Sequence, residues 1–444
     1  MRADEVQTSS VVTQWLQSAG HAAFSAYCIT AAFTTYFCMY AFRKPFTAGE
    51  FSDVVLWGIG YKTILVASQV MGYTLSKFIG IKVISEMPPN RRAMAIIGLI
   101  LFAEFALLLF AIVPPPFNSL MLFVNGLPLG MVFGLVLSFL EGRRMTEMLS
   151  AGLCASFIVS SGVVKSVGRA LIVDYGISEY WMPFLTGLIF FIPLLLGVTM
   201  LRQIPRPSGA DMEERNERTP MSRIDRSMLL RRHAWGLSGL ITVYILLTVI
   251  RSIRDDFAVE LWQGLGYQGT PAVYANSELA VVIGVLIANG VVSKVRDNRA
   301  AFLTSLVSVA AGFVLVLSVI WAQQRGHLSA FTFMVLIGLG TYVPYVMFHT
   351  TIFERLLAVF RDRGNLGFLM YLADATGYLG YVLVMVIKNF TAMEFDVLPL
   401  YMHLSLWIAA LSSIITLVLL AYYFRAIVQP RTVQGNALST QGDT

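Results

Sequence analysis

Several charged residues stand inside long apolar stretches of this 444-residue sequence. Arg43 and Lys44 follow one such stretch, and Arg251 lies within another. A charged side chain at the centre of a membrane helix costs about 2.5–3.5 kcal/mol on insertion scales, so it normally faces a partner or a polar cavity. An arginine guanidinium binds a phosphate or a carboxylate through two parallel hydrogen bonds. The pattern therefore predicts a buried site for a small anion.

Polar residues fall on single faces when their stretches are drawn as helices with 100° per residue. Five predicted helices each carry such a stripe, and independent structural accidents explain that coincidence poorly. Lys62 and Arg169 could instead reach the membrane surface, and Glu104 and His349 could bond to a neighbouring helix. The stripes are Tyr36, Tyr40 and Arg43; Lys62, Gln69, Tyr73 and Lys77; Ser161, Lys165 and Arg169; Tyr244, Thr248, Arg251 and Asp255; Tyr371, Asp374, Tyr378 and Tyr381.

Cations outnumber carboxylates among these buried residues, and a surplus of positive charge in a medium of low dielectric constant favours an anionic ligand. The alternative is that the charged groups only neutralise one another in salt bridges. The cations are Arg43, Lys44, Lys77, Lys165, Arg251 and Arg254, and the carboxylates are Asp255, Asp256, Glu278 and Asp374.

The elements that position these residues are membrane helices. Hydrophobic residues make up 57% of the chain and charged residues only 13%, about half the charged share of a soluble domain. Apolar stretches of about 20 residues predict membrane-spanning helices. We predict twelve, near 20–46, 57–81, 93–113, 118–140, 148–172, 180–201, 234–257, 271–293, 300–321, 329–353, 365–388 and 399–425.

The loops between these spans predict the orientation of the chain. Most of the 32 Lys and Arg residues lie in the loops that share a side with both termini, while Arg43, Lys44, Arg254, Arg325 and Lys388 fall on the other side. The positive-inside rule therefore places both termini in the cytoplasm, and we expect a multi-pass protein of the plasma (inner) membrane. Basic residues used in this way do not indicate a nucleic-acid partner.

The longest loop divides the spans six and six. Residues 202–233 hold eight arginines, and they separate a half at 20–201 from a half at 234–425. Arg43 and Arg251 occupy matching places in the two halves, as do Gly126-Leu127 and Gly338-Leu339. This arrangement favours the major facilitator fold, an all-α integral membrane architecture of twelve helices in two halves. The remaining segments are an N-terminal tail, 1–19, and a C-terminal tail, 426–444, which we expect to be disordered.

Four local patterns resemble one transporter family. They are the tyrosine-rich first span ending in Arg43-Lys44; Tyr73-Thr-Leu-Ser-Lys77-Phe-Ile; Arg251 followed by Asp256-Phe257; and Glu278 followed by Ser293-Lys294-Val295. At these residues the chain resembles the organophosphate:inorganic phosphate antiporters of the major facilitator superfamily, which include the glycerol-3-phosphate and hexose-phosphate transporters. It departs from them in span 5, where Val159 stands in place of the family's cavity histidine.

The resemblance implies that Arg43 and Arg251 bind the phosphate group, with Lys77 beside them. It also implies that Lys44, Asp256 and Glu278 exchange salt bridges as the halves move. Helical periodicity instead favours Asp255 as a partner of Arg251. Together with the stripes, this predicts substrate-binding residues Arg43, Arg251, Lys77, Lys165, Tyr36, Tyr40, Tyr73, Tyr244 and Tyr378, and gating or proton-coupling residues Lys44, Asp255, Asp256, Glu278 and Asp374.

We therefore expect a secondary transporter of a small organophosphate, phosphate or organic acid that works by alternating access. It would be an antiporter with a counter-anion or a proton symporter, with Glu278 or Asp374 carrying the proton. The alternative is a membrane sensor for the same anion that does not transport. The histidines and cysteines are scattered, so we expect no enzyme activity, no metal and no cofactor. We expect a monomer in the lipid bilayer.

Overall fold

The computed structural model describes residues 10–56, 58–140, 146–205, 223–267, 270–360, 366–390 and 396–428. Parts of three predicted segments lie outside the described residues. They are 1–9 of the N-terminal tail, 206–222 of the linker and 429–444 of the C-terminal tail.

Every predicted span overlaps a long helix. The helices are α2 (His21–Met39), α3 (Tyr61–Glu86), α4 (Arg92–Ile112), α5 (Asn118–Leu140), α6 (Thr146–Val173), α7 (Met182–Gln203), α10 (Ala234–Asp256), α12 (Ala272–Ser293), α13 (Asn298–Gln324), α14 (Ala330–Met347), α16 (Leu366–Phe390) and α17 (Val397–Val428). Within the described ranges, eleven helices are long and apolar enough to cross a membrane. The chain is an all-α, multi-pass membrane protein. α3 is not among the eleven.

Two predicted boundaries are wrong. The first span was expected to continue to residue 46, but α2 ends at Met39 and gives way to two 3₁₀ turns, η1 (Tyr40–Phe42) and η2 (Pro45–Ala48). The second was expected from residue 57, but α3 begins at Tyr61 after a short antiparallel hairpin of β1 (Val55–Leu56) and β2 (Ile59–Gly60). Gly58 takes a positive φ in this turn, and a right-handed helix does not contain residues with a positive φ.

Short helices cover the ends of the long ones. The predicted N-terminal tail contains α1 (Val11–Ser18), and the predicted linker contains α9 (Arg223–Arg232). Two further helices, α11 (Ala258–Gly264) and α15 (Phe353–Phe360), follow α10 and α14. A single π-helical turn, η4 (Phe348–Ile352), joins α14 to α15.

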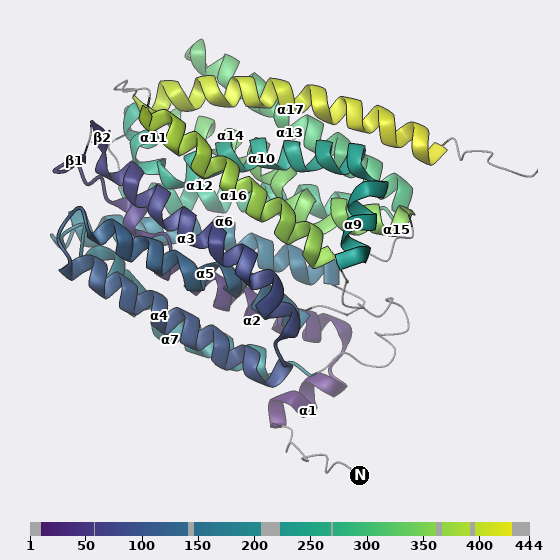
Figure 1. Cartoon of the computed structure of the whole chain (residues 1–444), viewed down its shortest axis with the longest axis horizontal. Helices are drawn as coiled ribbons and strands as arrows, with labels where there is room; N and C mark the ends of the chain where they lie inside the picture. The colour runs from purple at the N-terminus through teal and green to yellow at the C-terminus, as the bar shows by residue number, and fades with distance from the viewer. Residues whose placement is uncertain are drawn as a thin grey trace, which may run out of the picture.

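The packing of the first six long helices is repeated in the last six. α2 contacts α5, α6 and α7, just as α10 contacts α14, α16 and α17. α3 packs on α5 as α12 packs on α14, and α4 packs on α5 and α7 as α13 packs on α14 and α17. The chain therefore forms an N-terminal group (α2–α7) and a C-terminal group (α10–α17), which occupy opposite sides of the molecule in Figure 1.

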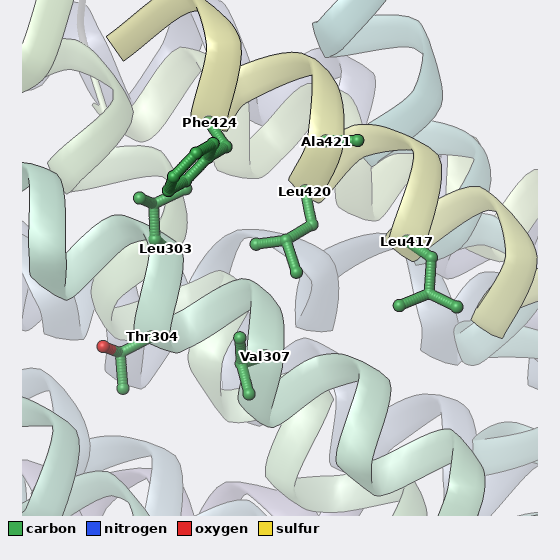
Figure 2. Close-up of a pocket in the computed structure, with 7 residues that line it drawn as sticks. All are labelled: Leu303, Thr304, Val307, Leu417, Leu420, Ala421 and Phe424. Atoms are coloured by element: carbon green, nitrogen blue, oxygen red, sulfur yellow. The ribbon is translucent and has the colours of Figure 1, made fainter. Parts of the chain in front are cut away.

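The two groups meet mainly through two helix pairs, α6 with α12 and α3 with α16. In Figure 1, α3 and α16 lie side by side where the blue and green parts of the bundle meet. On the outside of the C-terminal group, α13 and α17 border an apolar groove (Figure 2).

α3 and α5 approach each other closely at two glycines. A Cβ atom on Gly72 would lie 2.1 Å from the carbonyl oxygen of Phe123, and one on Gly126 would lie 2.3 Å from that of Gln69. Only glycine fits at this distance. The close approach brings Gln69 next to Asn125, and these two side chains position the candidate site.

Candidate functional site

Arg43 lies at a break in the first membrane helix, between η1 and η2. The break frees backbone carbonyls that a continuous helix would pair, and no water is present in hydrocarbon to bond them. Two buried side-chain amides from other helices donate hydrogen bonds to these carbonyls instead. Asn125 donates to the carbonyl of Phe42 (3.0 Å) and Gln69 donates to that of Arg43 (2.5 Å). Gln69 also donates to Asn125 (2.9 Å), so the two amides form one network that holds the break.

The Arg43 guanidinium is enclosed by tyrosine rings. Its central carbon lies 3.6 Å from the centre of the Tyr73 ring, 5.5 Å from that of Tyr378 and 5.7 Å from that of Tyr40. The residue is only 2% exposed, and within the described residues it forms no ion pair with a carboxylate. Cation–π contacts of this kind stabilise a desolvated guanidinium without neutralising it.

Arg251 reaches the same place from the C-terminal group, but it lies within an unbroken helix, α10, five residues before that helix ends. It donates to the hydroxyl of Tyr378 (3.2 Å), and its central carbon lies 4.3 Å from the Tyr345 ring. It is 3% exposed and, like Arg43, forms no ion pair along the described chain. Arg43 and Arg251, called the arginine pair below, thus both contact Tyr378, Arg43 near its ring and Arg251 at its hydroxyl.

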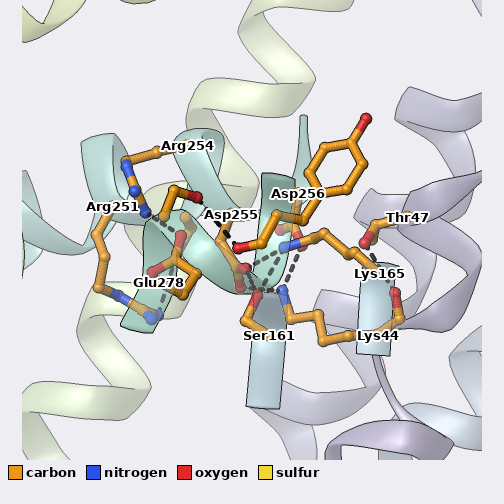
Figure 3. Close-up of polar contacts among 12 residues, drawn as sticks. Lys44, Thr47, Ser161, Lys165, Arg251, Arg254, Asp255, Asp256 and Glu278 are labelled. Atoms are coloured by element: carbon orange, nitrogen blue, oxygen red, sulfur yellow. Dashed lines mark hydrogen bonds and ion pairs between the residues drawn. The ribbon is translucent and has the colours of Figure 1, made fainter. Parts of the chain in front are cut away.

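A first ion-pair layer joins the two groups of helices on one side of the arginine pair. Lys44 contacts both Asp255 (2.8 Å) and Asp256, while Lys165 contacts Asp255 (2.5 Å). Figure 3 shows the two lysines converging on Asp255 from the N-terminal group. Lys44 therefore pairs with both Asp255 and Asp256, and neither aspartate forms an ion pair with Arg251.

The first ion-pair layer extends to the end of the helices through Lys62. Its ammonium contacts Glu260 (2.6 Å) on α11 and donates to the carbonyl of Thr47 (2.8 Å). Lys62 is buried, and these two partners hold its ammonium. Nearby, Arg169 contacts Glu50 (2.7 Å), which also accepts from Gln263 of the C-terminal group (3.0 Å).

A second ion-pair layer lies on the other side of the arginine pair. Lys77 of α3 contacts Asp374 of α16 at 2.8 Å. Tyr244 donates to the same carboxylate, and the Nε2 atom of His349 lies 3.5 Å from it. Lys62 and Lys77 are fifteen residues apart on α3, so roughly 22 Å along that helix separates these two lysines.

The pairing leaves an excess of two cations among the ten buried charged residues that the sequence singles out. Lys44, Lys77, Lys165 and Arg254 contact the four carboxylates, the last through Glu278 at 2.7 Å. The two cations without a carboxylate are the arginine pair. In a region of low dielectric constant this positive charge attracts an anion strongly.

The structure thus divides the predicted substrate-binding residues. Tyr40, Tyr73 and Tyr378 come together with Arg43 and Arg251 at the arginine pair. Tyr36 makes an edge-to-face contact with Tyr40, with 5.6 Å between the ring centres. Lys165, Lys77 and Tyr244 are held in the ion-pair layers, although the Lys77 ammonium also lies 5.3 Å from the centre of the Tyr73 ring. The predicted gating residues Lys44, Asp255, Asp256 and Asp374 are all in these layers, and Glu278 is held by Arg254.

Three residues of α14 and η4 were missed as site residues. Tyr342 and Tyr345 lie 5.8 and 4.3 Å from the Arg251 guanidinium, and His349 reaches Asp374. Their spacing, i, i+3 and i+7, places them on one helical face and could have revealed them. His349 also belongs to η4, and single π-helical turns are frequent at functional sites.

Glu104 behaves differently from the other buried acids. It was expected to bond to a neighbouring helix, but neither carboxyl oxygen has a hydrogen-bond partner in the described part of the chain. It packs instead into the space left by Gly187 of α7, where a Cβ atom would lie 2.2 Å from Oε2 of Glu104.

Comparison with known proteins assigns no activity to this site. No curated protein matches the sequence. One family model matches residues 45–426, which include Arg251 and both ion-pair layers except Lys44. The chain therefore belongs to DUF5690, a family of unknown function.

Proposed function

We propose that this protein is a secondary transporter that carries a small anion between Arg43 and Arg251. The observation that supports this most is the arginine pair itself: two buried guanidiniums from the two groups of helices meet at Tyr378 without a carboxylate. A protein that used its buried charges only for structure would neutralise them, because an uncompensated charge in the membrane is costly.

The two ion-pair layers support alternating access. Each joins the N-terminal group to the C-terminal group, and they lie on opposite sides of the arginine pair. Opening one layer while the other stays closed would expose the anion to one side of the membrane at a time. The repeated helix packing fits the major facilitator fold, with α3 as a twelfth span. We place both termini in the cytoplasm and the protein in the plasma membrane, from the distribution of basic residues.

Charge balance favours exchange over proton symport. Without ligand, the arginine pair leaves two positive charges in the protein interior, and these oppose reorientation of the empty carrier. A dianion such as phosphate or a phosphate ester would neutralise both. Glu278 and Asp374, the two candidate proton carriers, are already held in ion pairs by Arg254 and Lys77.

A ligand screen followed by counterflow tests this proposal. Purified protein is screened for thermal stabilisation by phosphate, phosphate esters, carboxylates and sulfonates, and the best ligand is used for counterflow in proteoliposomes. We expect Arg43→Ala and Arg251→Ala each to weaken binding by at least about thirtyfold, since removing one partner of a buried charged contact costs about 2–5 kcal/mol. Arg325→Ala, which alters an exposed arginine beside Trp321, is the control.

The outcomes separate the alternatives. Unchanged binding in both arginine variants would mean that the anion site lies elsewhere. Binding without uptake or counterflow would identify a sensor. Uptake that needs a proton gradient and no anion on the opposite side would replace exchange by proton symport.

A further inference from the structure

The apolar groove between α13 and α17 lies on the outside of the bundle, away from the arginine pair. It has a volume of about 540 Å³. Leucine, valine and phenylalanine side chains line it, and Thr304 adds the one polar side chain of its wall (Figure 2). The large apolar residues are Leu303, Val307, Leu417, Leu420 and Phe424.

The groove is open to the surroundings of the protein. Val307, Leu417 and Phe424 are each more than half exposed, and both helices belong to the candidate membrane spans. Hydrocarbon chains of the bilayer therefore face it. A chain lying in the groove gains van der Waals contacts on several sides, whereas a chain on a flat helix surface gains them on one.

Two arginines stand at one end of the groove. α13 and α17 run antiparallel, because Phe302 near the start of α13 contacts Tyr423 near the end of α17, with 4.9 Å between their ring centres. Arg299 precedes Leu303 by four residues and Arg425 follows Ala421 by four, so each shares a helical face with a groove residue. Both arginines are exposed, and neither forms an ion pair with another described residue.

We propose that this groove binds an anionic phospholipid. One acyl chain lies along the groove, and the phosphate of the headgroup contacts Arg299 and Arg425. The guanidinium fork matches the oxygens of a phosphate, and the apolar wall supplies the contact area. The distribution of basic residues places this end at the cytoplasmic surface, where anionic lipids create a negative potential. The site is separate from the arginine pair and does not depend on the proposed transport.

Retention of lipid through purification provides the test. The full-length protein is purified in mild detergent, incubated with phosphatidylglycerol or phosphatidylcholine of identical acyl chains, and examined by native mass spectrometry. We expect phosphatidylglycerol to be retained at least about tenfold better. We expect the double variant Arg299→Gln/Arg425→Gln to remove this preference, and Arg325→Gln at the opposite end of α13 to keep it.

A second variant tests the groove without touching the arginines. Ala421→Trp fills the space between the helices, and we expect it to lower phosphatidylglycerol retention about as much as the double arginine variant does. Monodisperse size-exclusion profiles establish that each variant folds. Equal retention of the two lipids by the unaltered protein would overturn the proposal. So would a double arginine variant that keeps the preference, or an Ala421→Trp variant that retains phosphatidylglycerol as well as the unaltered protein does.

Discussion

Arg43 and Arg251 reach the same tyrosine by different structural routes. Arg251 projects from an unbroken helix, and its neighbours along α10 fix its direction. Arg43 stands where α2 has ended, and its backbone is held by amides from α3 and α5. One arginine is thus positioned by its own helix and the other by two neighbouring helices. The N-terminal part of the site should therefore be the more easily disturbed by substitutions outside it.

Among the substitutions that test this comparison, removing the amide of Asn125 should have the largest effect on stability and on anion binding. Asn125→Leu leaves the carbonyl of Phe42 without its buried donor and takes an acceptor from Gln69. Each unpaired buried group costs about 1–3 kcal/mol, so we expect a loss of about 3 kcal/mol in the free energy of unfolding. Denaturant titration in micelles measures it, and anion binding should fall in parallel.

The matched control lies in the C-terminal group. Asn289 is equally buried, but its side-chain oxygen accepts from Thr350 and supports no arginine. Asn289→Leu should cost about 1 kcal/mol and leave anion binding unchanged. Equal losses of binding in the two variants would contradict the view that Arg43 depends on the amide network.

Replacing each arginine by lysine should have the next largest effect. Lysine keeps the charge but loses the planar fork. We expect Arg251→Lys to lower uptake about tenfold, and Arg43→Lys about thirtyfold, because Arg43 also loses its close stack on Tyr73. Radiolabelled uptake into proteoliposomes at equal protein content gives both values. A larger loss for Arg251→Lys would reverse the comparison.

Removing one tyrosine hydroxyl should distinguish the contact made by Arg251 from the contact made by Arg43. Tyr378→Phe deletes the oxygen that accepts from Arg251 while keeping the ring near Arg43. We expect anion affinity to weaken about fivefold, equivalent to about 1 kcal/mol. Tyr73→Phe, which preserves the ring under Arg43, should change affinity less than twofold. If Tyr73→Phe had the greater effect, the assignment of ring contact to Arg43 and hydroxyl contact to Arg251 would be wrong.

A substitution of Glu104 should have the smallest effect. Glu104 follows Ala103, and the carbonyl of Ala103 accepts a hydrogen bond from Asn125. Glu104→Gln keeps the shape of a side chain that has no hydrogen-bond partner among the described residues. We expect the free energy of unfolding to change by less than about 0.5 kcal/mol. A large loss of anion binding in this variant would extend the site to α4.

The helices and the stripes on them could be predicted from the sequence because they depend on local periodicity. Arg251 was placed from its phase on a single helix, and the same reasoning aligned Asp374 with Tyr378. The break after Met39 could not be predicted, because it exists only where Gln69 and Asn125 are available to bond its carbonyls. Those amides come from residues 26 and 83 positions away in the sequence.

Pairing of the charges was equally hard to predict. Helical spacing suggested that Asp255 would face Arg251. Instead, the Asp255 carboxylate forms ion pairs with Lys44 and Lys165 from the N-terminal group. Spacing along one helix cannot rank such partners, because they approach from other helices. The family resemblance suggested contact of Lys77 with the substrate, whereas in this structure Asp374 holds it.

The two ion-pair layers are unequal, and under the alternating access proposed above this difference would give the protein a preferred direction of opening. Lys44, Lys62 and Lys165 all tie the groups together in the first layer, while Lys77 alone does so by an ion pair in the second, among the described residues. Thermal fluctuations should therefore admit water more often past Lys77. An unloaded population would rest with its site accessible from that side, and a thiol reagent would label a cysteine introduced at Phe133 faster from there.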